Sequence, residues 1–500
     1  GIEKEDERQA CAVLSLTETE DDQPIPLPAF QREEGPGDAK VSSKLSAEQK
    51  SQLDRVMRSH ENIFSDVPGK TTWIQCELKQ TTDTPIYVRQ YPLPFATHTK
   101  VEEEVQEMLR LGIIERSSSA YNATVLLVKK PDETNRLCVD FRRLNGVLVP
   151  DSEPMPRVDA VFAAVGNKRY FSKMDFVKGY WQIPLSDDSQ PKTAFSTTSG
   201  LYHFRYMPFG VKTAPAVFAK LMRKVVDGIP DVAHYYDDVL VATDSWEQHL
   251  TALQTLFGRI QAAGLTIRPT KCEFGMEQID FLGHRIGKGQ LAPLGKTLDK
   301  IEKASVPTTK RQVRAFLGLT GYYRDFIPDY AKISGPLTDL TKKKERNQVE
   351  WRTAHQSAFD ELKERIANPP ILRLPDFGKD FVLRTDASDT SLGAMLMQQH
   401  DSRLHPVAYA SRKLLAREAA YSTIERECLA LVWGVQKFSP YLYGRKFLVQ
   451  TDHQPLKYIN QAKQLNSRVL RWSLLLQEFP FTIEHIKGSE NVGADFLSRL

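Results

Sequence analysis

Three aspartates at the ends of apolar runs are the residues of this sequence best suited to metal-dependent chemistry. Asp237 and Asp238 are adjacent in HYYDDVLVAT, where two short β-rich runs meet. Adjacent carboxylates repel each other and resist burial, so a buried pair normally needs a compensating cation, whereas a bare pair is more often an exposed turn. Asp175, in KMDFVKGYWQIPL, has a similar strand-end context. Three such carboxylates can hold two Mg²⁺ ions about 4 Å apart, the arrangement used for in-line phosphoryl displacement.

A second set of acidic residues lies in the C-terminal region. Two of them follow apolar strand-like runs, one lies early in a helical run, and one follows NVGA; they are Asp386, Asp452, Glu427 and Asp495. Taken singly, each would be a surface residue or a helix cap. Together they resemble the acidic set of an RNase H domain, and this resemblance implies a second two-ion site that activates water. Because Glu425 is only two residues from Glu427, we expect one of these two glutamates to lie outside the site.

Short helices and hairpins must position the first set. Helical periodicity is clear at 99–112, at 214–226 and in WEQHLTALQTLFGRIQAAGL, which Gly264 ends. A further helix is predicted after Ser46 as N-cap. The runs ATVLLVKK and RLCVDF predict a hairpin, and YFSKMDF and YWQIPL predict strands. This mixture over residues 85–290 indicates an α+β domain rather than a parallel doubly wound one.

Two further regions follow. Residues 291–346 carry 12 Lys/Arg against 6 Asp/Glu and contain two helical runs, which predicts a small basic helical module. One run combines basic and aromatic residues, namely Arg311, Arg314, Tyr322, Tyr323 and Arg324. Such a mixture suits contact with a nucleic-acid backbone, or alternatively a helical bundle whose rings form the core. From Phe381 onward, an order β-β-α-β-α-β predicts a second α/β core of about 120 residues.

The composition argues against secreted and membrane classes. The chain of 500 residues is 41% hydrophobic and 26% charged, which is typical of a globular protein with several domains. It has no apolar run near the ~20 residues that span a bilayer, and GIEKEDERQA lacks a signal-peptide core. The five cysteines are far apart without a CxxC pair, so we expect a reducing compartment.

Charge is distributed unevenly along the chain. Residues 1–40 have a net charge of −7, whereas residues 41–500 have a net charge of +11. We expect the acidic, proline-rich residues 1–44 to form a disordered tail, and the basic remainder to suit a polyanionic partner.

Several long motifs occur in a fixed order: VDFRRLN, MDFVKGYWQIPL, TAFSTTSGLYHFRYMPFGVKTAPAVF, YYDDVLVAT and FLGHRI. From about Leu45 to Leu500 the chain resembles the reverse transcriptase–RNase H segment of gypsy-type (Metaviridae) LTR retrotransposon Pol polyproteins. The resemblance implies an α+β right-hand polymerase with fingers, palm and thumb, followed by an α/β RNase H-like domain. It also implies metal ligation by the two acidic sets, and the match at ECLAL favours Glu427 over Glu425.

The resemblance implies nucleotide contacts as well. Arg136 matches the fingers arginine that contacts the incoming triphosphate, and either Lys129 or Lys130 would supply a second phosphate contact. Tyr180 matches the bulky residue that closes off the sugar 2′ position and so selects dNTPs over rNTPs. Phe209, in MPFG, fits the gypsy pattern beside it.

Three other positions complete the comparison. FLGHRI resembles the primer grip, so Phe281 to His284 would seat the primer terminus. Tyr236 stands where the gypsy pattern favours an aliphatic residue, which puts fidelity and dNTP affinity in doubt but not the metal site. His485 either matches the mobile histidine that assists product release or is an exposed residue of a strand.

We therefore expect RNA- and DNA-directed DNA synthesis together with cleavage of the RNA strand of RNA–DNA hybrids. The implied cofactor is Mg²⁺, two ions per site, with Mn²⁺ as an alternative. The implied partners are dNTPs, a primer–template duplex and an RNA–DNA hybrid. We expect no membrane partner, and the protein would be either a monomer or a homodimer. The expected location is cytoplasmic, within virus-like particles, with nuclear entry as a further expectation. The expected domains are the tail (1–44), fingers and palm (45–290), a thumb or connection-like region (291–372) and RNase H (373–500).

Three alternatives stay open at this point. The chain could be a catalytically dead binding protein, an RNA-dependent RNA polymerase, or a polymerase whose RNase H domain is only an architectural dimer partner. The intact carboxylates argue against the first, and Tyr180 with the appended RNase H argues against the second. Without a DTG or DSG motif or an HHCC motif, we expect neither proteolysis nor strand transfer from this chain.

Overall fold

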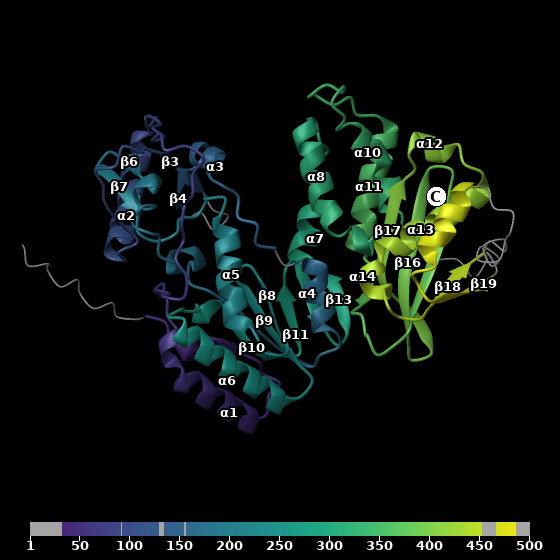
Figure 1. Cartoon of the computed structure of the whole chain (residues 1–500), viewed down its shortest axis with the longest axis horizontal. Coiled ribbons are helices and arrows are strands. Elements are labelled where there is room, and N and C mark those ends of the chain that lie inside the picture. The colour runs from purple at the N-terminus through teal and green to yellow at the C-terminus, as the bar shows by residue number, and fades with distance from the viewer. Residues whose placement is uncertain (1–32, 92, 130–134, 155–156, 453–466, 487–500) are drawn as a thin grey trace, which may run out of the picture.

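The computed structural model describes residues 33–91, 93–129, 135–154, 157–452 and 467–486. The fingers lie at one end, the palm lies at the bottom, and the thumb lies between the fingers and the RNase H-like domain at the other end (Figure 1). The fold is thus an α+β right-hand polymerase followed by an RNase H-like domain, as the sequence motifs imply. None of the helices within these ranges is both long and apolar enough to cross a bilayer.

The palm is built on a five-stranded sheet with the order β1-β10-β5-β9-β8. Its strands are β1 (Lys40–Val41), β5 (Tyr170–Asp175), β8 (Val232–Tyr235), β9 (Asp238–Thr243) and β10 (Glu273–Met276). Its helices are α1 (Ala47–Ser59), α4 (Val158–Val165), α5 (Ala214–Val226) and α6 (Trp246–Ala262). Ser46 caps α1 as predicted, because its side chain accepts a hydrogen bond from the Gln49 amide at 3.1 Å.

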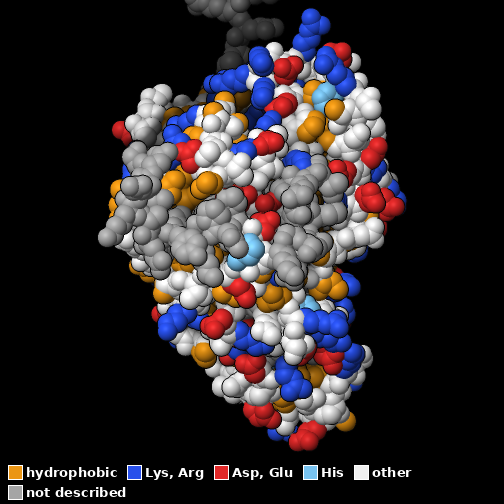
Figure 2. Space-filling model, turned by 90° about the vertical axis from the view of Figure 1, so that its right-hand side faces the viewer, with side chains coloured by type: hydrophobic (Ala, Val, Ile, Leu, Met, Phe, Trp, Pro, Cys, Tyr) orange, Lys and Arg blue, Asp and Glu red, His pale blue; other side chains and the backbone are white. Residues whose placement is uncertain are grey.

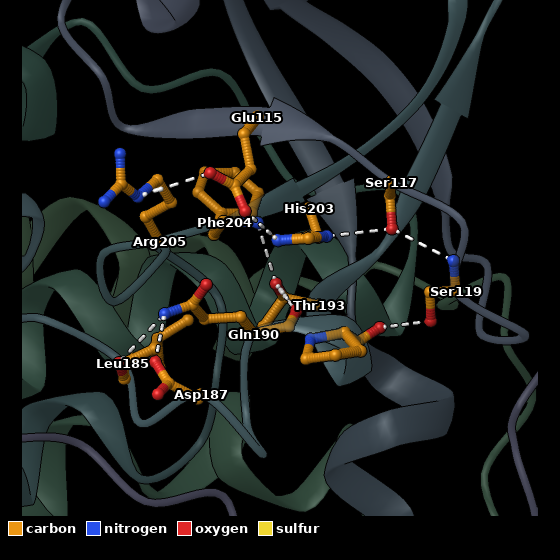
Figure 3. A network of polar contacts seen from close by, with 11 residues as sticks. Glu115, Ser117, Ser119, Leu185, Asp187, Gln190, Thr193, His203, Phe204 and Arg205 are labelled. Atoms are coloured by element: carbon orange, nitrogen blue, oxygen red, sulfur yellow. Dashed lines mark hydrogen bonds and ion pairs between the residues drawn. The ribbon is translucent and has the colours of Figure 1, made fainter.

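The fingers contain two smaller sheets. Their elements are α2 (Phe95–Arg110), β2 (Ile114–Arg116), β3 (Thr124–Lys129), β4 (Asn135–Asp140), α3 (Arg142–Val147), β6 (Phe195–Thr197) and β7 (Gly200–Phe204). A polar network joins β2 to β7: the His203 ring contacts Ser117 Oγ at 2.8 Å and Glu115 Oε1 at 3.0 Å (Figure 3). The network continues to the loop before β6, where Ser119 Oγ donates to the Pro191 carbonyl at 2.7 Å. These bonds hold the loop against the fingers sheet.

A four-stranded antiparallel sheet connects the palm to the thumb. It consists of β11 (Gln278–Phe281), β12 (His284–Gly287), β13 (Gln290–Pro293) and β14 (Leu372–Arg373). The thumb helices between its third and fourth strands are α7 (Gly295–Glu302), α8 (Lys310–Tyr322), α9 (Tyr330–Ile333), α10 (Gly335–Asp339) and α11 (Thr353–Ala367). The expected boundary at 290 therefore falls at the start of β13, and β14 brings the chain back to the same sheet.

The RNase H-like domain has a five-stranded sheet with the order β17-β16-β15-β18-β19. Its strands are β15 (Phe381–Ala387), β16 (Ser391–His400), β17 (Arg403–Lys413), β18 (Phe447–Thr451) and β19 (Phe481–His485). Its helices are α12 (Ala416–Ala419), α13 (Thr423–Lys437), α14 (Ser439–Leu442) and α15 (Ser467–Leu476). Figure 2 faces this end of the molecule, where basic side chains gather toward the top.

Three expectations from the sequence need correction. YWQIPL is no strand, because Gly179–Gln182 form the 3₁₀ helix η3 after Lys178 turns the chain with φ 45°. Three strands rather than two precede α13, because the segment after β15 is a long hairpin of β16 and β17. The predicted tail, 1–44, is structured at its end, where β1 pairs in parallel with β10; residues 1–32 lie outside the described residues.

Gly264 ends α6 in a geometry that only glycine adopts without strain. Its φ is +68°, its amide donates to Gln261 O at 3.0 Å, and the next amide donates to Ile260 O at 3.0 Å. These two bonds form a Schellman motif. A Cβ at this position would lie 2.5 Å from the Lys70 carbonyl oxygen.

We therefore expect Gly264→Ala to lower the free energy of unfolding by about 2–3 kcal/mol, through strain at positive φ and a backbone clash. Gly258→Ala is the matched control, since Gly258 lies inside α6 with no neighbouring atom nearer than 4.0 Å to the added Cβ. The control should raise stability by about 0.5 kcal/mol. Urea unfolding of both variants checks this; equal effects of the two changes would contradict it.

Candidate active sites

The palm hairpin places two of the three predicted carboxylates beside the third. Strand β8 ends at Tyr235 and β9 begins at Asp238, so Tyr236 and Asp237 form the turn, with Tyr236 in the left-handed region at φ 54°. Asp238 lies directly opposite Asp175 in the antiparallel β5–β9 pair. Opposite residues in such a pair have Cβ atoms about 5 Å apart. The register therefore brings Asp175 and Asp238 together, with Asp237 at the tip next to them.

The electrostatics show that the three carboxylates repel one another. Burial, together with the charges of Asp237 and Asp175, raises the pKa of Asp238 to about 6. Burial also raises the pKa of Asp175; the neighbouring Lys271 opposes this shift, and Asp237 reinforces it. Clustered carboxylates with raised pKa values are typical of sites that bind cations.

Lys271 belongs to this site, although the sequence did not single it out. Its Nζ lies 3.4 Å from both carboxylate oxygens of Asp175. Lys271 ends the short turn before β10, nearly one hundred residues after Asp175 in sequence, so only the sheet order β10-β5-β9 brings the two together. A local pattern such as PTKC carries no signal of this contact.

The donor set fits hard divalent cations. All three side chains offer carboxylate oxygens, which Mg²⁺ prefers, and the amino group of Lys271 already occupies a cation position beside Asp175. Within the described ranges, no three acidic, His or Cys side chains are already arranged as a complete metal cluster. The site therefore has suitable ligands whose side chains would adjust on binding.

Tyr180 and Phe209 lie together next to these carboxylates. Their ring centroids are 5.2 Å apart, and the Tyr180 ring packs at 5.7 Å against Phe218 of α5. Burial, together with the nearby Asp237, raises the pKa of Tyr180 to about 12. Tyr180 thus forms a supported aromatic wall beside Asp237, although it lies on η3 rather than on a strand.

The predicted triphosphate contacts lie on the fingers hairpin. Lys129 ends β3, and Arg136 in β4 pairs with Val128. The side chains of Lys129 and Arg136, and all of Lys130, lie outside the described residues. Their role as phosphate contacts stays a prediction.

The predicted primer grip is a tight turn bonded to the thumb. Leu282 and Gly283 connect β11 to β12 with φ values of 44° and 72°. Tyr322 Oη donates to the Leu282 carbonyl at 2.7 Å, and Tyr323 Oη donates to the Gly283 carbonyl at 2.8 Å. His284 is buried and stacks with Phe326 at 5.5 Å, and burial lowers its pKa to about 4.

The basic–aromatic run is predicted either to contact a nucleic acid or to form a helical core, and these bonds test the two predictions. Tyr323 is 1% exposed and belongs to the thumb core, so it has no surface for a nucleic acid. Tyr322 is 46% exposed and keeps a free face. Arg314 Nη2 donates to the Thr341 carbonyl at 3.0 Å within the thumb. The interpretation as a helical core is correct for Tyr323.

The RNase H-like domain brings three of its four predicted carboxylates together. Asp386 lies near the end of β15, Asp452 directly follows β18, and Glu427 lies in α13. Burial raises the pKa of Glu427 to about 8, and Asp386 and Asp452 add to the shift. Among the described residues, Glu427 Oε2 is buried without a hydrogen-bond partner. A buried carboxylate oxygen without a partner is well suited to bind a cation. Asp495 lies outside the described residues.

The structure also separates Glu425 from Glu427. Glu425 closes a capping box with Ser422, whose amide it accepts at 3.0 Å, and it accepts from Arg468 at 2.7 Å. These bonds occupy Glu425 at the helix N-terminus, while Glu427 faces the other two carboxylates. His485, at the end of β19, is exposed, and its Nε2 lies 3.0 Å from the Asp452 carbonyl oxygen. It therefore lies near this site, although its role stays a prediction.

The fold and the two carboxylate sites define a nucleic-acid polymerase of the right-hand class joined to an RNase H-like domain. Residues 128–286 match the family described as reverse transcriptase (RNA-dependent DNA polymerase), and residues 376–479 match the RNase H-like domain found in reverse transcriptase. Both families use divalent metal ions.

Curated relatives cover almost the whole chain. The retrovirus-related Pol polyprotein from transposon 297 of Drosophila melanogaster is 39% identical over 91% of this chain and 44% of the relative. That from transposon 412 is 37% identical over 90% of this chain and 37% of the relative. The chain thus spans less than half of these relatives. Its reverse transcriptase and RNase H-like domains are similar to the corresponding part of Pol polyproteins from the gypsy-type transposons 297, 412 and opus.

Solved structures agree on the fold. A foamy viral protease-reverse transcriptase dRH in complex with double-stranded DNA has a TM-score of 0.80 at 22% identity, covering 89% of this chain and 80% of that one. A foamy viral protease-reverse transcriptase in complex with an RNA/DNA hybrid has a TM-score of 0.75 at 22% identity, covering 91% of this chain and 62% of that one.

The raised pKa of Asp238 predicts a pH-dependent stability of the metal-free protein. The folded-state pKa, about 6, exceeds the ordinary value of 3.8, so Asp238 contributes stability that is present below about pH 4 and is lost as the pH rises through 6. Because Asn cannot ionise, the free energy of unfolding of Asp238→Asn should rise by about 2 kcal/mol relative to that of the unmodified protein between pH 4 and pH 7.

Urea unfolding in EDTA across this pH range measures the difference. Asp227→Asn is the control, because Asp227 is exposed just after α5. A stability difference for Asp238→Asn that stays constant with pH would contradict the electrostatic account.

Proposed function

We propose that this chain copies RNA and DNA templates into DNA from dNTPs and cleaves the RNA strand of RNA–DNA hybrids. The observation that supports it most directly is the pairing of Asp175 with Asp238 across β5 and β9, with Asp237 at the hairpin tip. A second carboxylate group, around Glu427, lies in the RNase H-like domain. The foamy viral complexes with double-stranded DNA and RNA/DNA hybrid support these partners by fold.

In the palm, Asp175, Asp237 and Asp238 would hold two Mg²⁺ ions, with Mn²⁺ as an alternative. When bound, the ions lower the barrier to displacement at the α-phosphate by activating the primer 3′-hydroxyl and neutralising the leaving pyrophosphate. The turn at Leu282 and Gly283 would position the primer terminus, because two thumb hydroxyls hold it rigidly. Lys271, beside Asp175, places a further positive charge next to the reacting phosphates.

In the RNase H-like domain, Asp386, Glu427, Asp452 and Asp495 would be the ligands. Burial beside Asp386 and Asp452 brings the pKa of Glu427 to about 8. A bound cation would therefore favour its ionised form at neutral pH. Contacts along the 2′-hydroxyls of the RNA strand would select the hybrid.

One reaction with two labels tests both activities. A labelled DNA primer on a separately labelled RNA template is incubated with Mg²⁺ and dNTPs, and Asp237→Asn, Asp386→Asn and the exposed-site control Asp227→Asn are compared. We expect Asp237→Asn to lose primer extension by at least about 1,000-fold while cleavage persists, and Asp386→Asn to show the reverse. Binding of the hybrid without extension or cleavage by the unmodified protein would overturn the proposal.

Tyr180 provides a test of sugar selection. Tyr180→Val removes the ring that would clash with a ribose 2′-hydroxyl, so rNTP incorporation relative to dNTP incorporation should rise about 100-fold. Tyr180→Phe keeps the ring and its packing against Phe209, so its selectivity should stay near that of the unmodified protein. Single-nucleotide incorporation kinetics measure both ratios. Equal selectivity of the Val and Phe variants would refute the steric role.

A further inference from the structure

The edge strand of the RNase H-like sheet, β17, presents two different faces to two neighbours. Successive side chains of a strand point to opposite sides. On one side, Ala410 lies in the core cluster beneath α13, and Arg412 lies over the ring of Trp433 of that helix at 5.9 Å. On the other side, three alternate residues near the end of the strand contact the thumb. We call Tyr409, Ser411 and Lys413 the docking strip.

Each member of the docking strip makes a different kind of contact. The Tyr409 ring packs against the thumb core cluster that contains Phe359. Ser411 Oγ accepts a hydrogen bond from the Ala331 amide at 3.0 Å. That amide lies in the first turn of α9, where backbone N–H groups have no partner within the helix, so the RNase H-like domain supplies one. The docking strip therefore combines an apolar contact with a hydrogen bond that fixes the position of the strand on the thumb.

The third contact is an ion pair at the end of the strip. Lys413 Nζ lies 3.4 Å from Asp339 Oδ2, and Lys342 Nζ of the thumb lies 2.8 Å from Asp339 Oδ1. Asp339 ends α10 and so bridges a cation of each domain. An exposed pair of this kind adds little energy but fixes an orientation.

The palm meets the RNase H-like domain in another way. A cavity of about 430 Å³ lies between palm, thumb and RNase H-like domain. Phe162 lines it from the palm, Tyr322 from the thumb, and Val407 and Tyr441 from the RNase H-like domain. This part of the junction is incompletely filled, whereas the docking strip contacts the thumb directly.

A continuous path joins the two candidate active sites. It begins at the Leu282 carbonyl, which accepts from Tyr322 of the thumb. Thr320 lies in the same helix as Tyr322, and its hydroxyl lies 3.0 Å from the Tyr330 hydroxyl of α9. The path crosses from Ala331 of α9 to Ser411 and then follows one row of the sheet, since Ser411 is paired with Gly393 and Gly393 with Asp386. Each step is a hydrogen bond, a strand register or a stretch of one helix, so the distance from the primer turn to Asp386 is set by these elements.

We propose that the docking strip makes thumb and RNase H-like domain one positioning unit, which fixes how far behind the primer terminus the RNA strand is cut. This rests on the proposed function. Tyr409, Ser411 and Lys413 are positioning residues, because none of them is among the carboxylates that would carry the reaction. Loosening the strip should change where the RNA is cut while leaving DNA synthesis intact.

The first test releases the strip. Tyr409→Ala, and separately the milder pair Ser411→Ala with Lys413→Gln, are compared with Tyr443→Ala and Lys446→Gln, two exposed positions of the same domain. A primer ended with a dideoxynucleotide is bound to end-labelled RNA, and cut positions are mapped. We expect the ratio of the principal cut to the neighbouring cuts to fall about tenfold in the release variants only. Primer extension, measured on an extendable primer, should stay within about twofold of that of the unmodified protein.

The second test locks the strip. Cysteines placed at 331 and 411, where the amide nitrogen and the hydroxyl oxygen lie 3.0 Å apart, are oxidised to a disulfide. We expect the locked protein to keep the principal cut and to lose secondary cuts. Loss of cleavage on locking, restored by a reductant, would overturn the inference, as would an unchanged cut pattern in the release variants. If the unmodified protein neither extends nor cleaves, the proposed function itself falls.

Discussion

Repulsion between carboxylates held at fixed positions is the constraint around which both halves of the molecule are arranged. In the palm, the antiparallel register of β5 and β9 places Asp175 opposite Asp238, and the fully buried Val239 and Leu240 that follow keep the hairpin in place. In the RNase H-like domain, β15, β18 and α13 bring Asp386, Asp452 and Glu427 together. A protein interior makes such clusters costly, so surrounding packing must supply the energy that holds them.

The thumb links these two costly clusters. Its hydroxyl groups at Tyr322 and Tyr323 bind the turn beside the palm, and its short helices α9 and α10 bind the edge strand β17. Tyr323 serves this purpose because it is buried, with its hydroxyl as the one polar end of an apolar ring. The run that the sequence suggested as a nucleic-acid contact is therefore partly a structural joint, whereas Tyr322 and the arginines of the run, Arg311, Arg314 and Arg324, are exposed.

Local signals explain what could be predicted from the sequence. Ser46 as N-cap, Gly264 as helix end and the bounds of α5 all depend on neighbouring residues, so the pattern alone identifies them. YWQIPL alternates like a strand, but Lys178 turns the chain and η3 packs its tyrosine against Phe218, so tertiary contacts override propensity. Lys271 could not be found in this way, because only the sheet order brings it to Asp175. Glu427 was separable from Glu425 only by family resemblance, whereas the structure gives the reason in the capping box.

Strand β1 has a consequence for where this chain can be cut. Its two residues pair in parallel with β10, which lies beside the strand that carries Asp175, and they cover what would otherwise be an open sheet edge. Unpaired edges invite association with other chains, so a fragment beginning after Val41 would expose β10 and become prone to aggregation. Lys40 and Glu273 reinforce this cover with an ion pair at 3.1 Å. The folded palm thus includes an edge strand that lies upstream of every motif recognised in the sequence.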